Sequence, residues 1–582
     1  MAWALRGGAG GAALLSFKIG PVQAFIEAAR SLRDLLTGSY LLSTLVFAAI
    51  EPLLEACGPT ALIYPALRGV PVMDHWLWRQ GVGVARPQSE ELVRPSIPHR
   101  FLALVPHSLA SNLMTAAREA ALTRWREIAA AVRARLKSKL DADWPGWDRL
   151  WEAQIEPYFD ARATAFRISE ADQEALLGSD ALRRFEPIAQ LGWCGNVKPG
   201  SWQNSIEISA RLMEACSQIR HIPSYTPVGD VPQKCALLGT YEQMGPARLR
   251  DSNRFFEEGL KFEKGTDRLC AISLTKRFAF NYYFQDHLGI DLTPFPDMID
   301  LCQRSGKGFR YYSLILMDGD EMGGWLSGEK SPQIRKVLHP KIVAWHERSN
   351  GNPPALELRR PVSPALHAAI SEALNRFATE TAPRIVKEHN GVVIYCGGDD
   401  LLAALPLITA LECAHKLRLA FSSFDILGDR ATASAGLVIA HEMEDLRYVL
   451  RWARDSEKRS KRARKDRVTL AVLRRSGEHS AASCRWDYLP TLGAQCASFR
   501  RGSSDRWTYL LRRQLPVLQG LPAEALRGEL KRLLARSEKR DPRFAKDLDE
   551  YLKLEGQPPE QGVLADFLAL CQSASFMARG RD

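Results

Sequence analysis

The feature that most constrains the fold of this chain is the sequence Gly-Gly-Asp-Asp at Gly397–Asp400, which lies between two short apolar runs. The runs Val392–Tyr395 and Leu401–Leu405 have the length and the side chains typical of strands. Because glycine and aspartate are turn formers, these runs are predicted to form a β-hairpin with both carboxylates at its tip. A third apolar run, Tyr312–Met317, predicts a buried strand that ends directly at Asp318.

The order of elements around these strands is typical of one arrangement. After the strand that starts near residue 311, the pattern predicts a helix at 366–377, the hairpin, a helix at 409–421, a strand at 431–440, a helix at 446–464 and a strand at 468–473. The first part of this order, βαββαβ, indicates a ferredoxin-like palm domain, and the last helix and strand extend it.

The rest of the chain gives a coarser pattern. The N-terminal part predicts a strand at Ala13–Lys18, a turn at Gly20-Pro21 and a helix at Val22–Leu36. Residues 108–190 are rich in Ala, Leu, Arg and Glu and predict helices. Regularly spaced leucines in the last hundred residues predict a small helical bundle.

Composition places this 582-residue chain among globular proteins, because 46% of its residues are hydrophobic and 25% are charged. The net charge of +11 favours polyanionic partners, such as nucleic acid or nucleotide phosphates. No run approaches the ~18 apolar residues that a membrane span needs, so we expect no membrane association. The 11 cysteines include no Cys-x-x-Cys pair, which predicts reduced thiols in the cytoplasm.

Three aspartates are the strongest candidates for chemistry. In a βαββαβ sheet the first strand lies beside the hairpin, so Asp318 is expected near Asp399 and Asp400. Carboxylates on adjacent strands can hold the divalent cations that assist phosphoryl or nucleotidyl transfer, and such oxygen ligands suit Mg or Mn. The alternative is that Gly-Gly-Asp-Asp is only a favourable turn. Asp320 is as easily explained by a capping role.

A basic cluster, Lys458–Lys465, closes the predicted helix at 446–464. Cations at a helix C-terminus often only complement the helix dipole. The functional alternative is triphosphate binding by one lysine that points toward the carboxylates, and Lys461 is the best candidate.

Motifs spread from residue 16 to residue 478 carry a family resemblance. They are Ser16–Ile26, Ala29–Leu35, Gly38–Ser43, Leu316–Gly323, Tyr395–Asp400, Ala431–Ala440 and Leu470–Glu478. In this order they resemble the large palm-domain subunit, a polymerase/cyclase, of Cmr-type (type III-B) CRISPR RNA-guided effector complexes.

The resemblance implies an α+β multidomain chain with two ferredoxin-like palm domains, similar to nucleotide cyclases, and with helical domains. We therefore expect a first palm-like domain without a catalytic motif at 10–150 and a mostly helical or irregular domain with a degenerate zinc motif at 151–305. The second palm domain with the Gly-Gly-Asp-Asp motif is expected at 306–480, and a helical bundle at 481–582.

The resemblance also implies an antiviral activity: synthesis of cyclic or linear oligoadenylate messengers from ATP after the complex binds a complementary foreign RNA. Guide RNA, target RNA and other Cmr subunits would be partners, and Mg or Mn the cofactor. Carried over by motif, Asp318, Asp399 and Asp400 would be catalytic and bind the metal, whereas Gly319, Gly397, Gly398 and Lys461 would bind the nucleotide.

Two departures from the family pattern matter. Many members begin with a His-Asp nuclease domain, but this chain contains no His-Asp dipeptide, so we expect no DNase activity in it. Members often bind zinc through paired Cys-x-x-Cys motifs. In this chain, Leu238 stands where the second cysteine of the pair that begins at Cys235 would be. Zinc is therefore not expected, and the remaining candidate ligands would be Cys194, Cys216, Cys235 and His221.

Other functions stay open at the level of sequence. A diguanylate cyclase would carry Glu-Phe after the first aspartate of the motif, where this chain has Asp400-Leu401. A scaffold with an inactive palm could hold RNA and partner proteins through basic surfaces such as Arg500-Arg501 and Lys531-Arg532. In a third interpretation, the palm binds the metals but is an enzyme that joins ATP to a second adenosyl compound such as S-adenosylmethionine.

Overall fold

The computed structural model describes residues 11–140, 146–191, 200–219, 233–245, 268–289, 295–351, 353–423, 431–518, 521–537, 539, 541–555 and 562–579. The chain forms two compact units that are interleaved in sequence. The first unit contains Met1–Ala28, Thr37–Leu292 and Glu321–Asn375, and the second contains Ala29–Leu36, Thr293–Asp320 and Arg376–Asp582.

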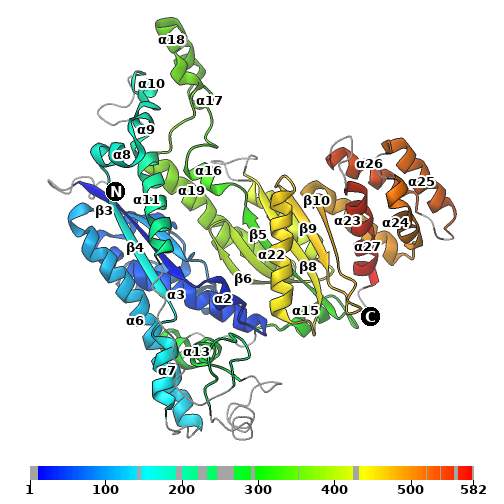
Figure 1. Cartoon of the computed structure of the whole chain (residues 1–582), viewed down its shortest axis with the longest axis horizontal. Helices are drawn as coiled ribbons and strands as arrows, with labels where there is room; N and C mark the ends of the chain where they lie inside the picture. The colour runs from blue at the N-terminus through cyan, green and yellow to red at the C-terminus, as the bar shows by residue number, and fades with distance from the viewer. Residues whose placement is uncertain are drawn as a thin grey trace. The chain divides into compact units, whose positions relative to one another are not determined.

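The first unit is built on a four-stranded antiparallel sheet in the order β2-β3-β1-β4 (Figure 1). Its strands are β1 (Ala12–Gly20), β2 (Leu62–Tyr64), β3 (Arg100–Pro106) and β4 (Asp160–Arg167). This is the strand order of a ferredoxin-like fold. β4 was not predicted, and it carries this sheet past residue 150, where the first domain was expected to end.

Helices account for most of the other described residues of the first unit. They include α4 (Pro71–Arg79), α5 (Ser89–Leu92), α6 (His107–Leu140), α7 (Trp147–Ile155), α8 (Glu170–Leu177), α9 (Ser179–Arg183), α10 (Glu186–Ala189), α11 (Ser201–Gln218), α13 (Ala271–Ala279), α14 (Gln285–Leu288) and α16 (Met322–Leu326). α11 covers one face of the sheet, where Trp202 packs with Leu14 and Leu104. Ser16 Oγ lies 2.6 Å from Ser209 Oγ on the same face.

The helix predicted at Val22–Leu36 is divided in two, and that prediction was wrong in this respect. α2 covers Gln23–Glu27, and α3 starts again at Leu32 and runs to Cys57. The buried ammonium of Lys276 donates to the carbonyl oxygens of Phe25, Ile26 and Ala28 at 2.6, 3.0 and 2.9 Å. It satisfies carbonyls that a continuous helix would have bonded internally, and so stabilises the break.

α3 also corrects the expectation that no segment reaches the length of a membrane span. Among the described helices it is the one that is long and apolar enough to cross a membrane by length and composition. Of its most apolar window, 67% is buried inside the fold. This degree of burial is typical of a core helix.

The second unit is built on a six-stranded sheet in the order β10-β9-β8-β5-β7-β6. Its strands are β5 (Tyr311–Gly319), β6 (Val392–Gly397), β7 (Asp400–Pro406), β8 (Ala433–His441), β9 (Arg467–Val472) and β10 (Ser480–Arg485). The order β8-β5-β7-β6 is that of a ferredoxin-like palm, which confirms the expected α+β fold. β9 adds parallel to β8, and β10, which was not predicted, adds antiparallel to β9.

The helices of this palm follow the predicted order. α20 (Ala382–Glu388) precedes the hairpin, α21 (Ala410–Phe421) follows it, and α22 (Leu446–Arg462) lies across β8 and β9 (Figure 1). α15 (Met298–Arg304) comes before β5. The helix predicted at 366–377 corresponds to α19 (Pro364–Arg376), which belongs to the first unit up to Asn375 and passes through a π-helical turn into α20.

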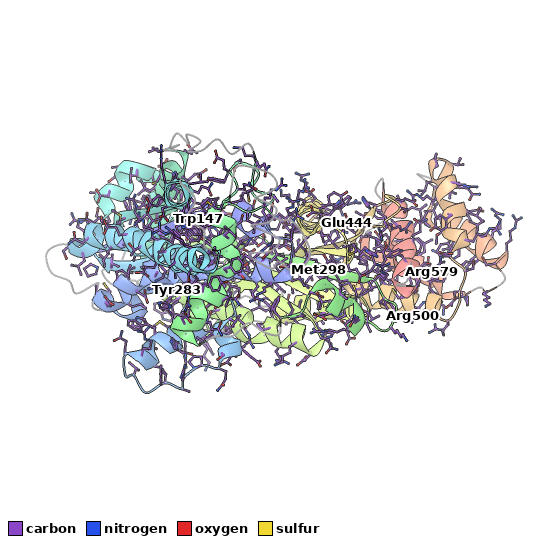
Figure 2. All side chains as sticks on the ribbon, turned by 90° about the horizontal axis from the view of Figure 1, so that it is seen from below. Trp147, Tyr283, Met298, Glu444, Arg500 and Arg579 are labelled. Atoms are coloured by element: carbon purple, nitrogen blue, oxygen red, sulfur yellow. The ribbon has the colours of Figure 1, made fainter. Side chains whose placement is uncertain are left out.

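The chain after β10 forms helices, as the leucine spacing predicts. They are α23 (Leu489–Arg500), α24 (Arg506–Leu518), α25 (Ala523–Ala535), α26 (Arg543–Glu555) and α27 (Val563–Arg579). α27 packs against α23 and β10, which ties this bundle to the edge of the palm sheet. Arg500 and Arg579, labelled in Figure 2, are the last residues of α23 and α27.

Candidate active site

The three candidate aspartates meet at one edge of the second sheet. Asp318 is the penultimate residue of β5, and β5 pairs with β7, so that Met317 lies opposite Leu401. Asp399 lies in the hairpin turn, and Asp400 begins β7. One carboxylate oxygen from each residue lies within 4.8 Å of the others. The structure therefore brings together the residues that the sequence singled out.

The hairpin turn explains why two glycines precede the aspartates. Gly397 pairs with Asp400, which leaves Gly398 and Asp399 as a two-residue turn. Gly398 has a φ of +66°, in the left-handed region, and glycine at the first turn position is typical of a type II′ turn. This turn holds the Asp399 carboxylate at the tip, close to that of Asp318. Gly319 ends β5 opposite Ala433 of β8.

The donor set fits a hard divalent cation. All three aspartates are half-buried, and carboxylate oxygens are the ligands that Mg and Mn prefer. Three carboxylates at this separation repel one another unless a cation lies among them. A cationic group is in fact present, because the Lys461 ammonium is ion-paired with Asp318.

Lys461 and Glu457 are the two residues of α22 whose charged groups lie next to this cluster. Lys461 Nζ also lies 2.9 Å from Glu457 Oε1, one turn earlier on α22. Burial, and then the charge of Lys465, lowers the pKa of Lys461. Burial, followed by the charges of Asp400 and Asp320, raises the pKa of Glu457 to about 7. The sequence interpretation named Lys461 but missed Glu457, although Glu and Lys four residues apart on a helix were visible.

α22 lies unusually close to the sheet, and this closeness sets the position of Lys461. A Cβ on Gly436 of β8 would lie 2.2 Å from the Ala453 carbonyl oxygen and 2.8 Å from the Glu457 nitrogen. Glycine is therefore required for this approach. Ser460 Oγ donates to the Ala435 carbonyl at 2.8 Å and fixes the next turn of the helix to the strand.

Asp320 has a structural role in this arrangement. Its buried carboxylate accepts hydrogen bonds from Thr432 Oγ at 2.8 Å, from Ser434 Oγ at 2.7 Å and from the Asp466 backbone N–H at 2.9 Å. Arg464, Lys465 and Asp466 have φ values of 77°, 59° and 50°, a strained left-handed turn. Asp320 thus ties the turn after α22 to β8. This structural role is closer to the capping role considered for Asp320 than to metal binding.

Only two of the four residues that the sequence suggested for zinc, Cys216 and Cys235, lie in the described part of the chain, so this candidate site stays untested. Cys194 and His221 lie outside the described residues. Cys235 has Cys270 as its neighbour, and each sulfur lies 3.4 Å from Ser273 Oγ. Among the described residues, the aspartate cluster is the one group of three or more potential metal ligands of this kind.

Two segments of the chain match known protein families. Residues 311–469 match the family described as Cas10/Cmr2, second palm domain, and residues 14–130 match CRISPR-associated protein Cmr2, N-terminal. The chain is 26% identical to the CRISPR system Cmr subunit Cmr2 of Pyrococcus furiosus over 563 residues, which cover 82% of this chain and 63% of that protein. It therefore spans less than two thirds of that relative.

A second relative and two solved structures agree with these matches. A segment of 61 residues, 10% of this chain and 6% of its relative, is 46% identical to the Cmr2 subunit of Saccharolobus solfataricus. The fold is similar to a chain of the type III-B Cmr-beta complex in its apo state, with a TM-score of 0.68 and 14% identity, over 100% of this chain and 82% of the other. The complex bound to cognate target RNA gives a TM-score of 0.68 and 16% identity, over 100% and 84%. Over residues 14–130 and 311–469, the chain is similar to the Cmr2 family, the large palm-domain subunits of type III-B CRISPR systems.

Proposed function

We propose that this chain is the large subunit of an RNA-guided antiviral effector complex and that its second palm is a metal-dependent nucleotidyltransferase. Target RNA would activate it to convert ATP into cyclic or linear oligoadenylates. The observation that carries the proposal is the convergence of Asp318, Asp399 and Asp400 at one edge of a ferredoxin-like sheet. A turn used only for its shape would not need a third carboxylate from β5 beside it.

The three aspartates are the residues that would hold Mg or Mn. Bound divalent cations supply the positive charge that favours a deprotonated acceptor hydroxyl and a leaving pyrophosphate. Gly397 and Gly398 lack side chains, so the hairpin backbone can approach a nucleotide closely. Gly319, at the end of β5, would lie against the nucleotide in the same way. Lys461 would move from Asp318 to a phosphate oxygen once the aspartates are neutralised.

The proposed reaction joins two ATP molecules. The acceptor 3′-oxygen attacks the α-phosphorus of the second ATP, a new P–O bond forms, and the bond to pyrophosphate breaks. The hydroxyl proton leaves to solvent, and pyrophosphate is the leaving group. The chain's contribution is to align these groups and to stabilise charge, which the half-buried carboxylates and Lys461 are placed to do.

Guide RNA, target RNA and the other Cmr subunits are the proposed partners, and the cytoplasm is the proposed location. The net charge of +11 favours RNA as a partner. The basic pairs Arg500-Arg501 and Lys531-Arg532 lie on the C-terminal helices or directly after them.

The test is a double substitution, Asp399→Ala with Asp400→Ala, in the complex assembled from the full chain, guide RNA and the other Cmr subunits. With ATP, Mg and target RNA present, we expect the variant to assemble and bind target RNA but to yield no oligoadenylate. The matched control, Glu388→Ala with Glu412→Ala, removes two exposed carboxylates from the same palm and should keep the activity.

Retained synthesis in the Asp399/Asp400 variant would overturn the assignment of these residues. A wild-type complex that binds target RNA and makes no ATP-derived product would favour a scaffold with an inactive palm. Products that form only when a second adenosyl compound is added would favour the enzyme that joins ATP to that compound.

A further inference from the structure

Residues 331–360 of the first unit form a small arm, in which the outgoing and the returning ends of the segment are hydrogen-bonded to each other. Ile334 N donates to Leu358 O, and Arg360 N donates to Pro332 O, both at 2.9 Å. Between these contacts lie α17 (Ile334–Val337), α18 (Pro340–Asn350) and a 3-10 turn at Pro354–Glu357. Figure 1 shows α17 and α18 set apart from the first sheet.

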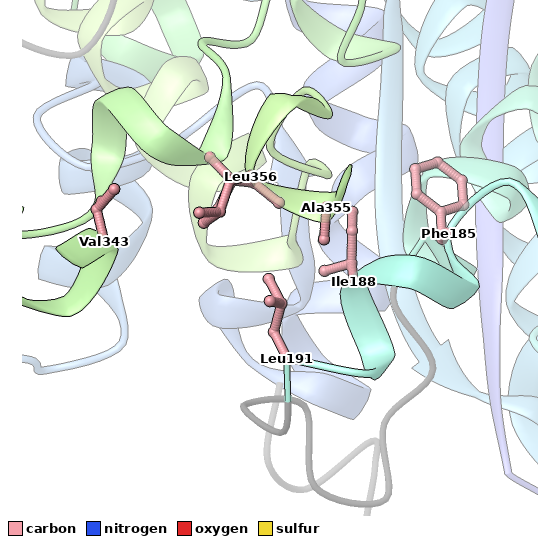
Figure 3. Close-up of a cluster of buried hydrophobic side chains, with 7 residues drawn as sticks. Phe185, Ile188, Leu191, Val343, Ala355 and Leu356 are labelled. Carbon is pink, nitrogen blue, oxygen red and sulfur yellow. The ribbon is translucent and has the colours of Figure 1, made fainter. Parts of the chain in front are cut away.

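The arm has an apolar core of its own. Buried side chains from the segment around α10 pack with buried side chains from the arm (Figure 3): Phe185, Ile188, Leu191, Ile334, Val343, Ala355 and Leu356. A segment with a core of this kind holds a defined surface, and is not a loose connection.

Some of the charges on the arm are paired. Arg335 Nη1 lies 2.5 Å from Glu347 Oε1, and Arg335 Nε lies 2.7 Å from Glu357 Oε1. These ion pairs link α17, α18 and the 3-10 turn.

The arm also has an outer face, the segment Lys336–Arg348, which exposes large apolar side chains. Val337 is 41% exposed, Ile342 is 44% exposed and Trp345 is 55% exposed. Ile342 and Trp345 are three residues apart and share one face of α18. Exposed apolar side chains gathered in one place mark interaction sites, and tryptophan is among the residues that contribute most to protein–protein binding.

The same segment of the arm also carries exposed cations. Lys336, Lys341 and Arg348 are exposed, and none of them forms an ion pair with a carboxylate in the described part of the chain. Lys341 and Arg348 lie four and three residues from Trp345 on α18, so this face of the helix combines apolar and basic side chains. A protein surface that matches it would offer an apolar pocket bordered by Asp and Glu.

We propose that this outer face, Lys336–Arg348, is a docking site for another protein subunit through an acidic surface with a pocket for Trp345. A protein is favoured over RNA because Val337 and Ile342 add apolar area that stacking bases do not need. The inference rests on the proposed function only in requiring that the chain assembles with other subunits.

The first test places a photo-crosslinking amino acid, benzoylphenylalanine, at position 345 of the full chain. The chain is assembled with guide RNA and the other Cmr subunits, irradiated and analysed by mass spectrometry. We expect one adduct, to an acidic segment of a protein subunit, and a weaker adduct at high salt. The matched control places the same residue at Leu419 of α21, which is also 55% exposed, and should not give that adduct.

The second test is the variant Trp345→Ala with Lys341→Glu. Because both side chains are exposed, the thermal midpoint should stay unchanged, while the affinity for the crosslinked subunit should fall ~10-fold or more. An adduct to RNA, no adduct in assembled complexes, or unchanged affinity would overturn the docking site while leaving the proposed function intact. Failure of the wild-type chain to assemble with any subunit would contradict both.

Discussion

At the scale of single residues, Glu457 stands out because it is a carboxyl group held beside other carboxylates. Burial is the main cause of its raised pKa, and the charges of Asp400 and Asp320 add to it. The folded state therefore binds a proton at Glu457 more tightly than the unfolded chain does. The resulting stabilisation is fully present below pH 4.5 and is lost as the pH rises through about 7.

Glu457→Gln removes this titration. Without divalent metal, we expect the free energy of unfolding of the wild type to fall relative to the variant as the pH rises from about 5 to about 8. Denaturant unfolding at several pH values, in the presence of a chelator, measures the difference. The control is Glu412→Gln, whose carboxyl has a pKa lowered by Lys416 and lacks this loss. A wild-type-to-variant difference that does not change with pH would contradict the prediction.

Asp320 and Asp399 should respond differently to removal of the carboxylate. Asp320→Ala leaves the Thr432 hydroxyl, the Ser434 hydroxyl and the Asp466 N–H without their acceptor, so we expect a loss of about 3 kcal/mol in the free energy of unfolding. Asp399→Ala removes a charge from a repelling cluster, so stability without metal should be unchanged or higher. Equal losses in both variants would contradict the division between structural and metal-binding aspartates.

The sequence was sufficient to place Asp318 with Asp399 and Asp400, because strand order alone brings a strand end beside a hairpin tip. It could not assign Asp320, whose partners Thr432, Ser434 and Asp466 lie more than a hundred residues away. The roles of Gly319, Gly397, Gly398 and Lys461 toward a nucleotide stay predictions.

At the scale of elements, the fit between α22 and β8 is the feature on which the site depends. The small residues Ala453, Ser456 and Ser460 face the strand, and Gly436 provides the space on the sheet. Lys461 and Glu457 reach the carboxylate edge because this helix lies so close.

Gly436→Ala should disturb this contact, because its Cβ would lie 2.2 Å from the Ala453 carbonyl oxygen. We expect the free energy of unfolding to fall by ~1–3 kcal/mol as α22 is pushed from the sheet. Thermal unfolding measures the change. The matched control, Gly493→Ala in α23, meets nothing within 4 Å and should be neutral or slightly stabilising. Equal effects at both positions would contradict the close-packing argument.

Element prediction succeeded where periodicity was strong and failed where long-range contacts decide. The hairpin and α22 were predicted from local pattern. β4 and β10 were missed because their burial is uneven and their sequences, with Arg and Ser among small residues, lack a clear alternation. The break between α2 and α3 depends on Lys276, almost 250 residues away, and no local signal reports it.

At the scale of the whole molecule, the two units each contain a sheet with the ferredoxin-like strand order, yet the candidate metal ligands gather in one of them. Among the described residues, the edge of the first sheet has no comparable group of carboxylates. The second unit also draws Ala29–Leu36 and Thr293–Asp320 from elsewhere in the chain. Domain boundaries placed one after another along the sequence cannot describe units that are interleaved in this way. The expected domain limits at residues 150, 305 and 480 stay predictions.

The central claim is that the second palm joins ATP molecules by attack on an α-phosphorus. The most direct measurement uses the assembled complex with Mg, target RNA and ATP labelled at either the α- or the γ-phosphate. We predict, only when target RNA is present, that the α-label enters oligoadenylate and that the γ-label is released in pyrophosphate, except for the one γ-phosphate that a linear product keeps at its 5′ end. A complex that binds target RNA but leaves both labels in ATP would contradict the account.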